Sequence, residues 1–200
     1  MLFESQLHDL YALLPWVSTH KAKGKIRAID TQKRRILTPE VIKEESEKVV
    51  ARIEEMQHFR DAKVIMLYYP VHNEVDLRSL VSKYENEKTF LFPALTHRSH
   101  HVEARVYEHH TPFVKGAFGI PQPKTQAYKG SIDLILVPGI SFDKQHWRVG
   151  RGGGYYDRFL KHYLTAFKIG VCYDFQLHEK VPHWLGDKRM DRIITPSQAI

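Results

Sequence analysis

One ten-residue stretch concentrates the residue types best suited to hold a phosphate chain. It runs from residue 148 to residue 157 and reads RVGRGGGYYD, with four glycines among residues 150–154. Glycine lets the backbone approach a ligand closely and turn several N–H donors toward an anion. Arg148 and Arg151 add planar guanidinium groups that match phosphate oxygens, and Asp157 adds a hard oxygen ligand for a divalent cation. The residue types therefore predict a nucleotide-binding loop.

Two common phosphate-binding patterns do not describe this loop. It is not a Walker A loop, because no Gly-Lys-Ser or Gly-Lys-Thr triplet closes it. The series Gly150, Gly152, Gly154 places Tyr155 where the dinucleotide-binding fingerprint needs its third glycine. A plain chain reversal needs one or two glycines, and each additional glycine costs backbone entropy. A loop specialised for binding is therefore favoured over a simple turn.

The composition indicates a basic chain with room for one core. Its 200 residues include 30 Lys and Arg against 23 Asp and Glu, a net charge of +7 that attracts anionic ligands. No run of about 18 apolar residues and no export signal is visible, so we expect no membrane partner. The single cysteine, Cys172, excludes an intrachain disulfide and suits a buried structural role. We expect a cytoplasmic protein.

Periodic patterns place the loop in an α/β fold. Helical spacing predicts helices over residues 21–37, 41–56, 75–87 and 155–164, the second of them capped by Thr38, Pro39 and Glu40. Short apolar runs predict strands at residues 63–69, 89–92, 102–107, 132–137 and 168–173. This alternation predicts a largely parallel sheet with both faces covered, in three α/β/α layers. Ligands collect beyond the carboxyl ends of such strands, where the glycine loop falls.

The division of the chain is simple. Residues 21–200 are predicted to form a single catalytic α/β domain. Residues 1–20 lie outside the alternation and are predicted to be an N-terminal extension. Leucines at positions 2, 7, 10, 13 and 14 could give that extension an amphipathic helix.

The loop and its neighbours resemble the 5-formyltetrahydrofolate cyclo-ligase family, also called 5,10-methenyltetrahydrofolate synthetases. That family carries a strand ending in Pro-Gly, then Phe-Asp, then Arg-x-Gly-x-Gly-x-Gly-Tyr-Tyr-Asp, which this chain matches over residues 137–157. Four shorter blocks agree: Lys23 with Arg27, Glu74 with Val75, residues 118–123 and residues 187–191. The resemblance spans residues 21–195. It departs from the family at His146, where a glycine is usual, and at Gly186, where a histidine is frequent.

The resemblance implies a NagB/RpiA/CoA-transferase-like fold and a ligase that uses ATP and Mg²⁺. The family cyclises 5-formyltetrahydrofolate to 5,10-methenyltetrahydrofolate, with release of ADP and phosphate through an N5-iminium phosphate. The task of such an enzyme is positioning and charge neutralisation. The implied partner is 5-formyltetrahydrofolate, polyglutamylated forms included. We expect no nucleic-acid partner and a monomer.

The resemblance also implies roles for residues of this chain. Arg148 and Arg151 are implied to be catalytic, and Asp157 and Asp187 to bind the metal. The implied ATP-binding residues are Lys23, Arg27, Arg148, Gly150, Arg151, Gly152, Gly153, Gly154, Tyr155 and Tyr156. The implied folate-binding residues are Tyr69, Glu74, Phe118, Arg151 and Tyr155.

Two alternatives remain open. The positive charge and the tyrosines also suit a non-catalytic polyanion-binding or RNA-binding module, which would show steeply salt-dependent binding. The second alternative is a related nucleotide-dependent enzyme on the same fold, because His146 could change how the chain enters the glycine loop. Without the resemblance, Lys23 and Arg27 would be interpreted as part of a solvated helix face.

Overall fold

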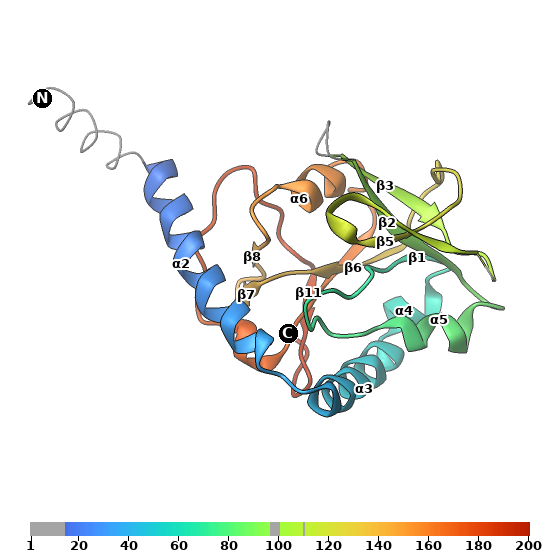
Figure 1. The fold of residues 1–200 in the computed structure, drawn as a ribbon, viewed down its shortest axis with the longest axis horizontal. Coiled ribbons are helices and arrows are strands. Elements are labelled where there is room, and N and C mark those ends of the chain that lie inside the picture. The colour runs from blue at the N-terminus through green and yellow to red at the C-terminus, as the bar shows by residue number, and fades with distance from the viewer. Residues whose placement is uncertain (1–14, 97–100, 110) are drawn as a thin grey trace, which may run out of the picture.

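The computed structural model of the chain describes residues 15–96, 101–109 and 111–200, and its centre is a six-stranded sheet (Figure 1). The strand order is β11-β9-β6-β1-β2-β3. All neighbours pair in parallel except β2 and β3, which are antiparallel. The strands are β1 (Val64–Met66), β2 (Thr89–Thr96), β3 (His101–Val106), β6 (Leu134–Pro138), β9 (Phe167–Val171) and β11 (Arg192–Ile194). The predicted largely parallel sheet is confirmed.

Helices cover both faces of this sheet (Figure 1). They are α2 (Pro15–Arg35), α3 (Pro39–Glu55), α4 (Gln57–Asp61), α5 (Arg78–Tyr84) and α6 (Tyr155–Leu160). One core joins α3, α4 and α5 to strand residues such as Ile65, and the other joins Phe159 of α6 to residues such as Met66. Successive strand residues point to opposite faces, which is why Ile65 and Met66 fall in different cores. The three-layer arrangement is confirmed.

Strand β11, helix α4, two small sheets and two short helical turns were not predicted. One small sheet has the order β10-β7-β8 and the other pairs β4 with β5. The elements of these sheets and turns are β4 (Phe113–Lys115), η1 (Ala117–Gly119), β5 (Pro121–Pro123), β7 (Ser141–Asp143), β8 (Arg148–Val149), η2 (Asp174–Gln176) and β10 (Leu177–His178). The antiparallel pairing of β7 with β8 sets Arg148 opposite Phe142, at the start of the glycine loop.

Several predicted boundaries move in the structure. The start of α3 is confirmed, because Thr38 Oγ1 accepts the Val41 N–H at 3.4 Å and Pro39 opens the helix. Helix α5 begins at Arg78 rather than at residue 75, since the Asp76 carboxylate accepts the Arg78 N–H at 3.0 Å. Helix α6 ends at Leu160 rather than at residue 164, and the strand predicted at 63–69 is limited to β1.

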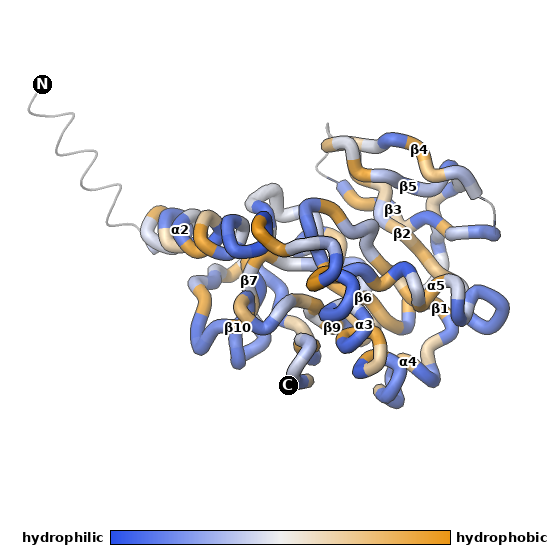
Figure 2. Tube along the Cα trace, turned by 60° about the horizontal axis from the view of Figure 1, so that its bottom comes forward, coloured by the Kyte–Doolittle hydropathy of each residue, from blue (hydrophilic) through white to orange (hydrophobic). Residues whose placement is uncertain are grey.

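Helix α2 buries charged side chains. Lys23, Asp30 and Arg34 are its buried residues, and their spacing puts them on one face of the helix. Figure 2 shows hydrophilic residues recurring along α2, whereas the central strands are mainly hydrophobic. The helix begins at Pro15 and so continues through residue 20, where the extension was predicted to end. The amphipathic helix predicted for the leucines at 2–14 lies outside the described residues. Within the described residues, no helix has the length and apolarity needed to cross a bilayer.

Candidate functional site

A cavity of about 730 Å³ lies at the carboxyl ends of β1 and β6. Tyr68 and Tyr69 after β1, and Pro138 and Gly139 at the end of β6, belong to its lining. The strand order reverses at β1, because α5 leads to β2 on one side while β6 lies on the other. Open α/β sheets bind ligands at such points, and the volume suits a small molecule.

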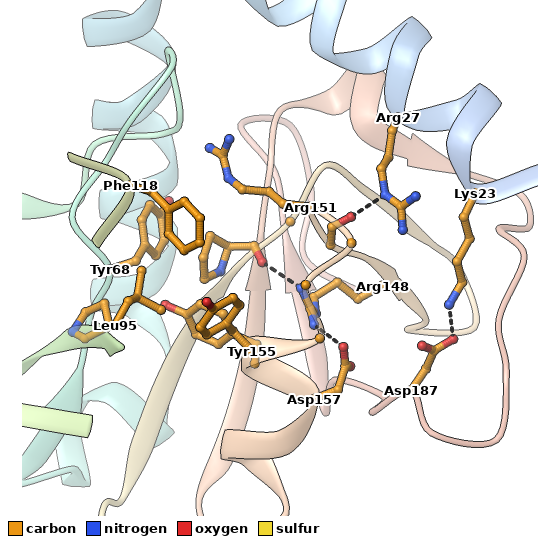
Figure 3. A pocket seen from close by; sticks show the side chains of 18 of the residues that line it. Lys23, Arg27, Tyr68, Leu95, Phe118, Arg148, Arg151, Tyr155, Asp157 and Asp187 are labelled. Carbon is orange, nitrogen blue, oxygen red and sulfur yellow. Dashed lines mark hydrogen bonds and ion pairs between the residues drawn. The ribbon is translucent and has the colours of Figure 1, made fainter. Parts of the chain in front are cut away.

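Every residue that the sequence analysis assigned to catalysis, ATP, folate or metal binding lines this cavity. The lining includes Lys23, Arg27, Tyr69, Glu74, Phe118, Arg148, Gly150, Arg151, Gly152, Gly153, Gly154, Tyr155, Tyr156, Asp157 and Asp187. Figure 3 shows the aromatic side chains on one side and the Lys23, Arg27, Asp157 and Asp187 side chains on the other. Residues as far apart as Lys23 and Asp187, 164 positions, are in contact there. Their separate roles stay predictions.

The backbone of the glycine loop depends on the absence of side chains. Gly152 and Gly154 have φ angles of 106° and 65°, in the left-handed region. A Cβ on Gly150 would lie 2.5 Å from Arg148 Nη1, so any larger residue there would displace the Arg148 guanidinium group. Arg27 Nε donates to the carbonyl of Gly150 at 2.7 Å, which ties α2 to the loop. Burial lowers the pKa of Arg27, and the carboxylate of Asp187 opposes that effect.

Two ion pairs lie beside the loop. Arg148 Nη2 lies 3.1 Å from Asp157 Oδ2, and Lys23 Nζ pairs with Asp187 Oδ2. The N–H of Trp184 also donates to Asp187 Oδ2, at 2.6 Å. The Nε atom of Arg148 is buried without a hydrogen-bond partner among the described residues. A buried donor without a partner is costly, and Arg148 also lines the cavity, so its guanidinium group suits an anion that binds there.

The two aspartates fit a magnesium ion that arrives with phosphate. Their side chains keep 20% and 15% of their surface exposed in the cavity wall. The described part of the chain contains no group of three or more His, Cys, Asp or Glu side chains placed to hold a metal. Magnesium is commonly bound by one or two carboxylates and completed by water and substrate phosphates. Asp157 and Asp187 therefore match a phosphate-bound Mg²⁺ better than a metal caged by protein.

Glu74 is a buried carboxylate held by donors from several elements. Its Oε1 lies 2.7 Å from Arg151 Nη2 and 3.6 Å from Arg34 Nη1, and its Oε2 accepts the Val71 N–H at 3.1 Å. Asn73, with φ of 60°, donates from Nδ2 to the Arg34 carbonyl at 3.2 Å. This turn fastens the Glu74 loop to the end of α2. Glu74 is thus a buried, oriented acceptor in the wall of the cavity.

Aromatic rings form the remaining wall. Phe118 is 62% exposed, has φ of 57°, and meets Tyr155 edge to face with ring centroids 5.8 Å apart. Burial raises the pKa values of Tyr68 and Tyr156, so both phenols stay neutral. This wall offers flat, mostly apolar surface to a ring system.

Sequence reasoning missed a further set of lining residues. They are Trp16, His20, Tyr68, Val71, His72, Pro93, Leu95, Ile120, Pro138, Gly139 and Trp184. Trp16 and His20 could have been found, because they continue the helical spacing of Lys23 and Arg27. Ile120, Pro138 and Gly139 belong to blocks that match the family pattern, although no site role was assigned to them. The remaining residues carry no local signal, since the fold alone brings them to the cavity.

Comparisons with known proteins agree on one family. The model of the 5-formyltetrahydrofolate cyclo-ligase family matches residues 19–196. The probable 5-formyltetrahydrofolate cyclo-ligase of Schizosaccharomyces pombe is 26% identical over 197 residues, covering 89% of this chain and 97% of that protein. The NMR structure of Aquifex aeolicus 5,10-methenyltetrahydrofolate synthetase has a TM-score of 0.78 and 32% identity, covering 88% of this chain and 91% of that one. A Mycoplasma pneumoniae 5,10-methenyltetrahydrofolate synthetase, at 23% identity and a TM-score of 0.69, shares the fold over 87% of this chain and 98% of its own.

Proposed function

Because the chain belongs to the 5-formyltetrahydrofolate cyclo-ligase family of enzymes, we propose that it converts 5-formyltetrahydrofolate to 5,10-methenyltetrahydrofolate with ATP and Mg²⁺. One observation carries the proposal: a glycine loop, four cations and two aspartates share one cavity with an aromatic wall and a buried glutamate. The loop and cations suit a triphosphate, whereas the wall and Glu74 suit a pterin. One cavity thus offers complementary surfaces to both reactants.

The phosphate end of the proposed site is made by four cations and the loop amides. They are Lys23, Arg27, Arg148 and Arg151. Each charge-assisted hydrogen bond contributes about 1.5 to 3 kcal/mol, so these side chains account for much of the phosphate affinity. Lys23 and Arg148 now pair with the two aspartates and would turn toward phosphate oxygens. Asp157 and Asp187 would then hold magnesium, which neutralises phosphate charge when bound.

The other end of the proposed site, which we call the folate end, would bind the pterin ring and fix its orientation. We assign Glu74 to the polar edge of the pterin and Tyr69, Phe118 and Tyr155 to its ring faces. Arg151 bridges the two ends, because it belongs to the glycine loop and contacts Glu74 at 2.7 Å. Arg151 is therefore placed to contact both ATP and the folate.

The proposed chemistry needs no covalent bond to the protein. The formyl oxygen attacks the γ-phosphorus, the bond from that phosphorus to the bridging oxygen breaks, and ADP leaves. N10 of the resulting N5-iminium phosphate attacks the formyl carbon and loses its proton, and phosphate departs. Arg148 and Arg151 offset the charge that develops on the transferring oxygens, which is the main catalytic requirement of phosphoryl transfer.

A direct assay tests the proposal. The purified chain is incubated with 5-formyltetrahydrofolate, ATP and magnesium, and the methenyl product is followed by its absorbance together with ADP release. We expect product only when all three components are present. Absence of product over a range of pH and magnesium concentration would rule the function out.

Replacing Asp157 by asparagine tests the metal role. Asp157→Asn keeps an acceptor for the Lys188 N–H, 3.2 Å away, but loses the negative charge that magnesium needs. We expect kcat/KM to fall by about two orders of magnitude, on the order of 3 kcal/mol. The loss of unfolding free energy should be smaller, because the asparagine still offers an oxygen to the buried Arg148 guanidinium group. Asp61→Asn, at an exposed position away from the cavity, is the control. Normal turnover of the Asp157 variant at limiting magnesium contradicts the assignment.

A further inference from the structure

Helix α2 presents one continuous stripe of side chains to the cavity and to the protein behind it. The stripe consists of Trp16, His20, Lys23, Arg27, Asp30 and Arg34. Successive members are separated by four or three residues, which keeps them on one face of an α-helix. The first four line the cavity and the last two are buried.

The chemistry of the stripe changes in order along the helix. Arg34 lies 3.6 Å from Glu74, at the folate end. Arg27 holds the glycine loop through Gly150, and Lys23 pairs with Asp187, one turn farther toward the N-terminus. The order is therefore folate end, phosphate loop and metal carboxylate. The next two positions of the stripe are aromatic.

Those aromatic positions form a partly exposed stack at the cavity. The rings of Trp16 and His20 have centroids 5.6 Å apart and an interplanar angle of 23°. Trp16 is 54% exposed, although it lines the cavity, and it belongs to neither hydrophobic core. Trp184, 37% exposed, lines the same cavity and donates its backbone N–H to Asp187. Flat rings beside the phosphate-binding cations match the π-face of a nucleobase.

We propose that Trp16, stacked on His20, is the subsite for the adenine ring of ATP. The inference depends on the proposed function, because the triphosphate must lie along Lys23 and Arg27. The helix rises about 10 Å from Lys23 to Trp16, which leaves room for a ribose between phosphates and base. If the pterin of the folate lies at Glu74, it is on the far side of Arg27 from Trp16 and His20. The pterin therefore does not occupy the aromatic end of the stripe. Trp16 precedes the residues matched by the family model, so that match assigns it nothing.

Comparing the binding of ATP with that of inorganic tripolyphosphate separates the contribution of the adenine base from that of the phosphates. The dissociation constants of ATP and of inorganic tripolyphosphate are measured by calorimetry on the full chain with magnesium. We expect Trp16→Ala to raise the ATP dissociation constant about tenfold, within the range of base stacking on an aromatic ring, and to leave that of tripolyphosphate unchanged. Trp16→Phe keeps a ring and should stay within about threefold of the unsubstituted chain. Ile29→Ala is the matched control, because Ile29 is 53% exposed on the same helix but outside the cavity.

The outcomes separate this subsite from the proposed reaction. If the chain cyclises the folate and Trp16→Ala binds ATP as tightly as before, the subsite is wrong and the function stands. Equal weakening of ATP and tripolyphosphate also overturns it, because the loss then concerns phosphate binding. A raised KM for 5-formyltetrahydrofolate with an unchanged KM for ATP assigns the rings to folate and overturns it as well. If the unsubstituted chain neither binds ATP nor cyclises the folate, both the adenine subsite and the proposed function are wrong.

Discussion

Glu74 and Arg34 form a buried ion pair at the end of the cavity that we assign to folate, and of these two side chains only Glu74 lines the cavity. Both side chains are almost fully buried, at 7% and 1% exposure. Burial lowers the pKa of Arg34, and the Glu74 carboxylate counteracts that shift. Arg34 does not line the cavity, so under the proposed function it would act on the folate by orienting Glu74.

Substituting Arg34 by methionine tests this positioning role. Arg34→Met keeps the length of the side chain and leaves Glu74 with Arg151 as its remaining cation within ion-pair distance. We expect KM for 5-formyltetrahydrofolate to rise about tenfold, while KM for ATP changes less than twofold. The loss of a buried partner should also lower the unfolding free energy by about 3 kcal/mol. Arg35→Met, at the exposed neighbour, is the control. Parallel increases in both KM values would refute the positioning role.

His146 has a backbone conformation that glycine adopts more easily. Its φ angle is 69°, in the left-handed region that favours glycine. We expect His146→Gly to raise the unfolding free energy by about 0.5 to 1 kcal/mol, because relief of backbone strain exceeds the added entropy of the unfolded chain. Gln145→Gly, next to it and without a positive φ, should lower stability by a similar amount. Urea unfolding with an unchanged m-value measures both, and effects of the same sign contradict the strain argument.

At the residue scale, the sequence predicted those site residues whose side-chain types and spacing indicate a role without knowledge of the fold. Glycines, arginines and an aspartate in one loop predicted a phosphate site, and the structure brings Lys23 and Arg27 to it. Arg34 escaped prediction because a basic residue on a helix is ordinarily solvated, and its burial depends on where α2 docks.

At the element scale, α2 docks through polar contacts. Asp30 is fully buried, and its Oδ2 accepts a hydrogen bond from Ser141 Oγ at 2.6 Å and lies 2.6 Å from His178 Nε2. Ser141 belongs to β7 and His178 to β10, so a single carboxylate joins the helix to the small sheet. Polar contacts hold the register of α2, and with it the position of Lys23 and Arg27.

Removing the serine hydroxyl should loosen this helix. Ser141→Ala deletes a hydrogen bond to a buried carboxylate, which contributes about 2 kcal/mol. We expect a matching loss of unfolding free energy and faster hydrogen exchange in α2 than in α3. Ser82→Ala, at an exposed site in α5, should change stability by less than about 0.5 kcal/mol. Uniform exchange in α2 and α3 would show that Asp30 does not fasten the helix.

The elements that the sequence predicted are those with strong periodicity. The strands of the central sheet other than β11 were found as apolar runs, and α3 as an amphipathic helix with a proper cap. Strands β7, β8 and β10 contain two or three residues each, too few for any period, and exist because they pair with one another. Helix α5 was predicted too long because residues 75–77 belong to the Glu74 loop.

For the whole molecule, the two cores on opposite faces of the sheet predict protection of the thiol. Cys172 is buried at 1% exposure, and burial raises its pKa well above the usual value, so the thiol stays protonated at mildly alkaline pH. It is the single cysteine of the chain. We expect a disulfide reagent to label the folded protein at least about a thousandfold more slowly than the urea-unfolded protein. Rapid labelling of the folded protein would show that the core beside β9 opens readily.

The pairing of Lys23 with Asp187 has a consequence for synthesis on the ribosome. These partners are separated by 164 positions. A nascent polypeptide that already contains helix α2 and the glycine loop still lacks one of the proposed metal carboxylates until residue 187 has been translated. If the proposed function is right, fragments truncated before residue 187 should be unable to consume ATP.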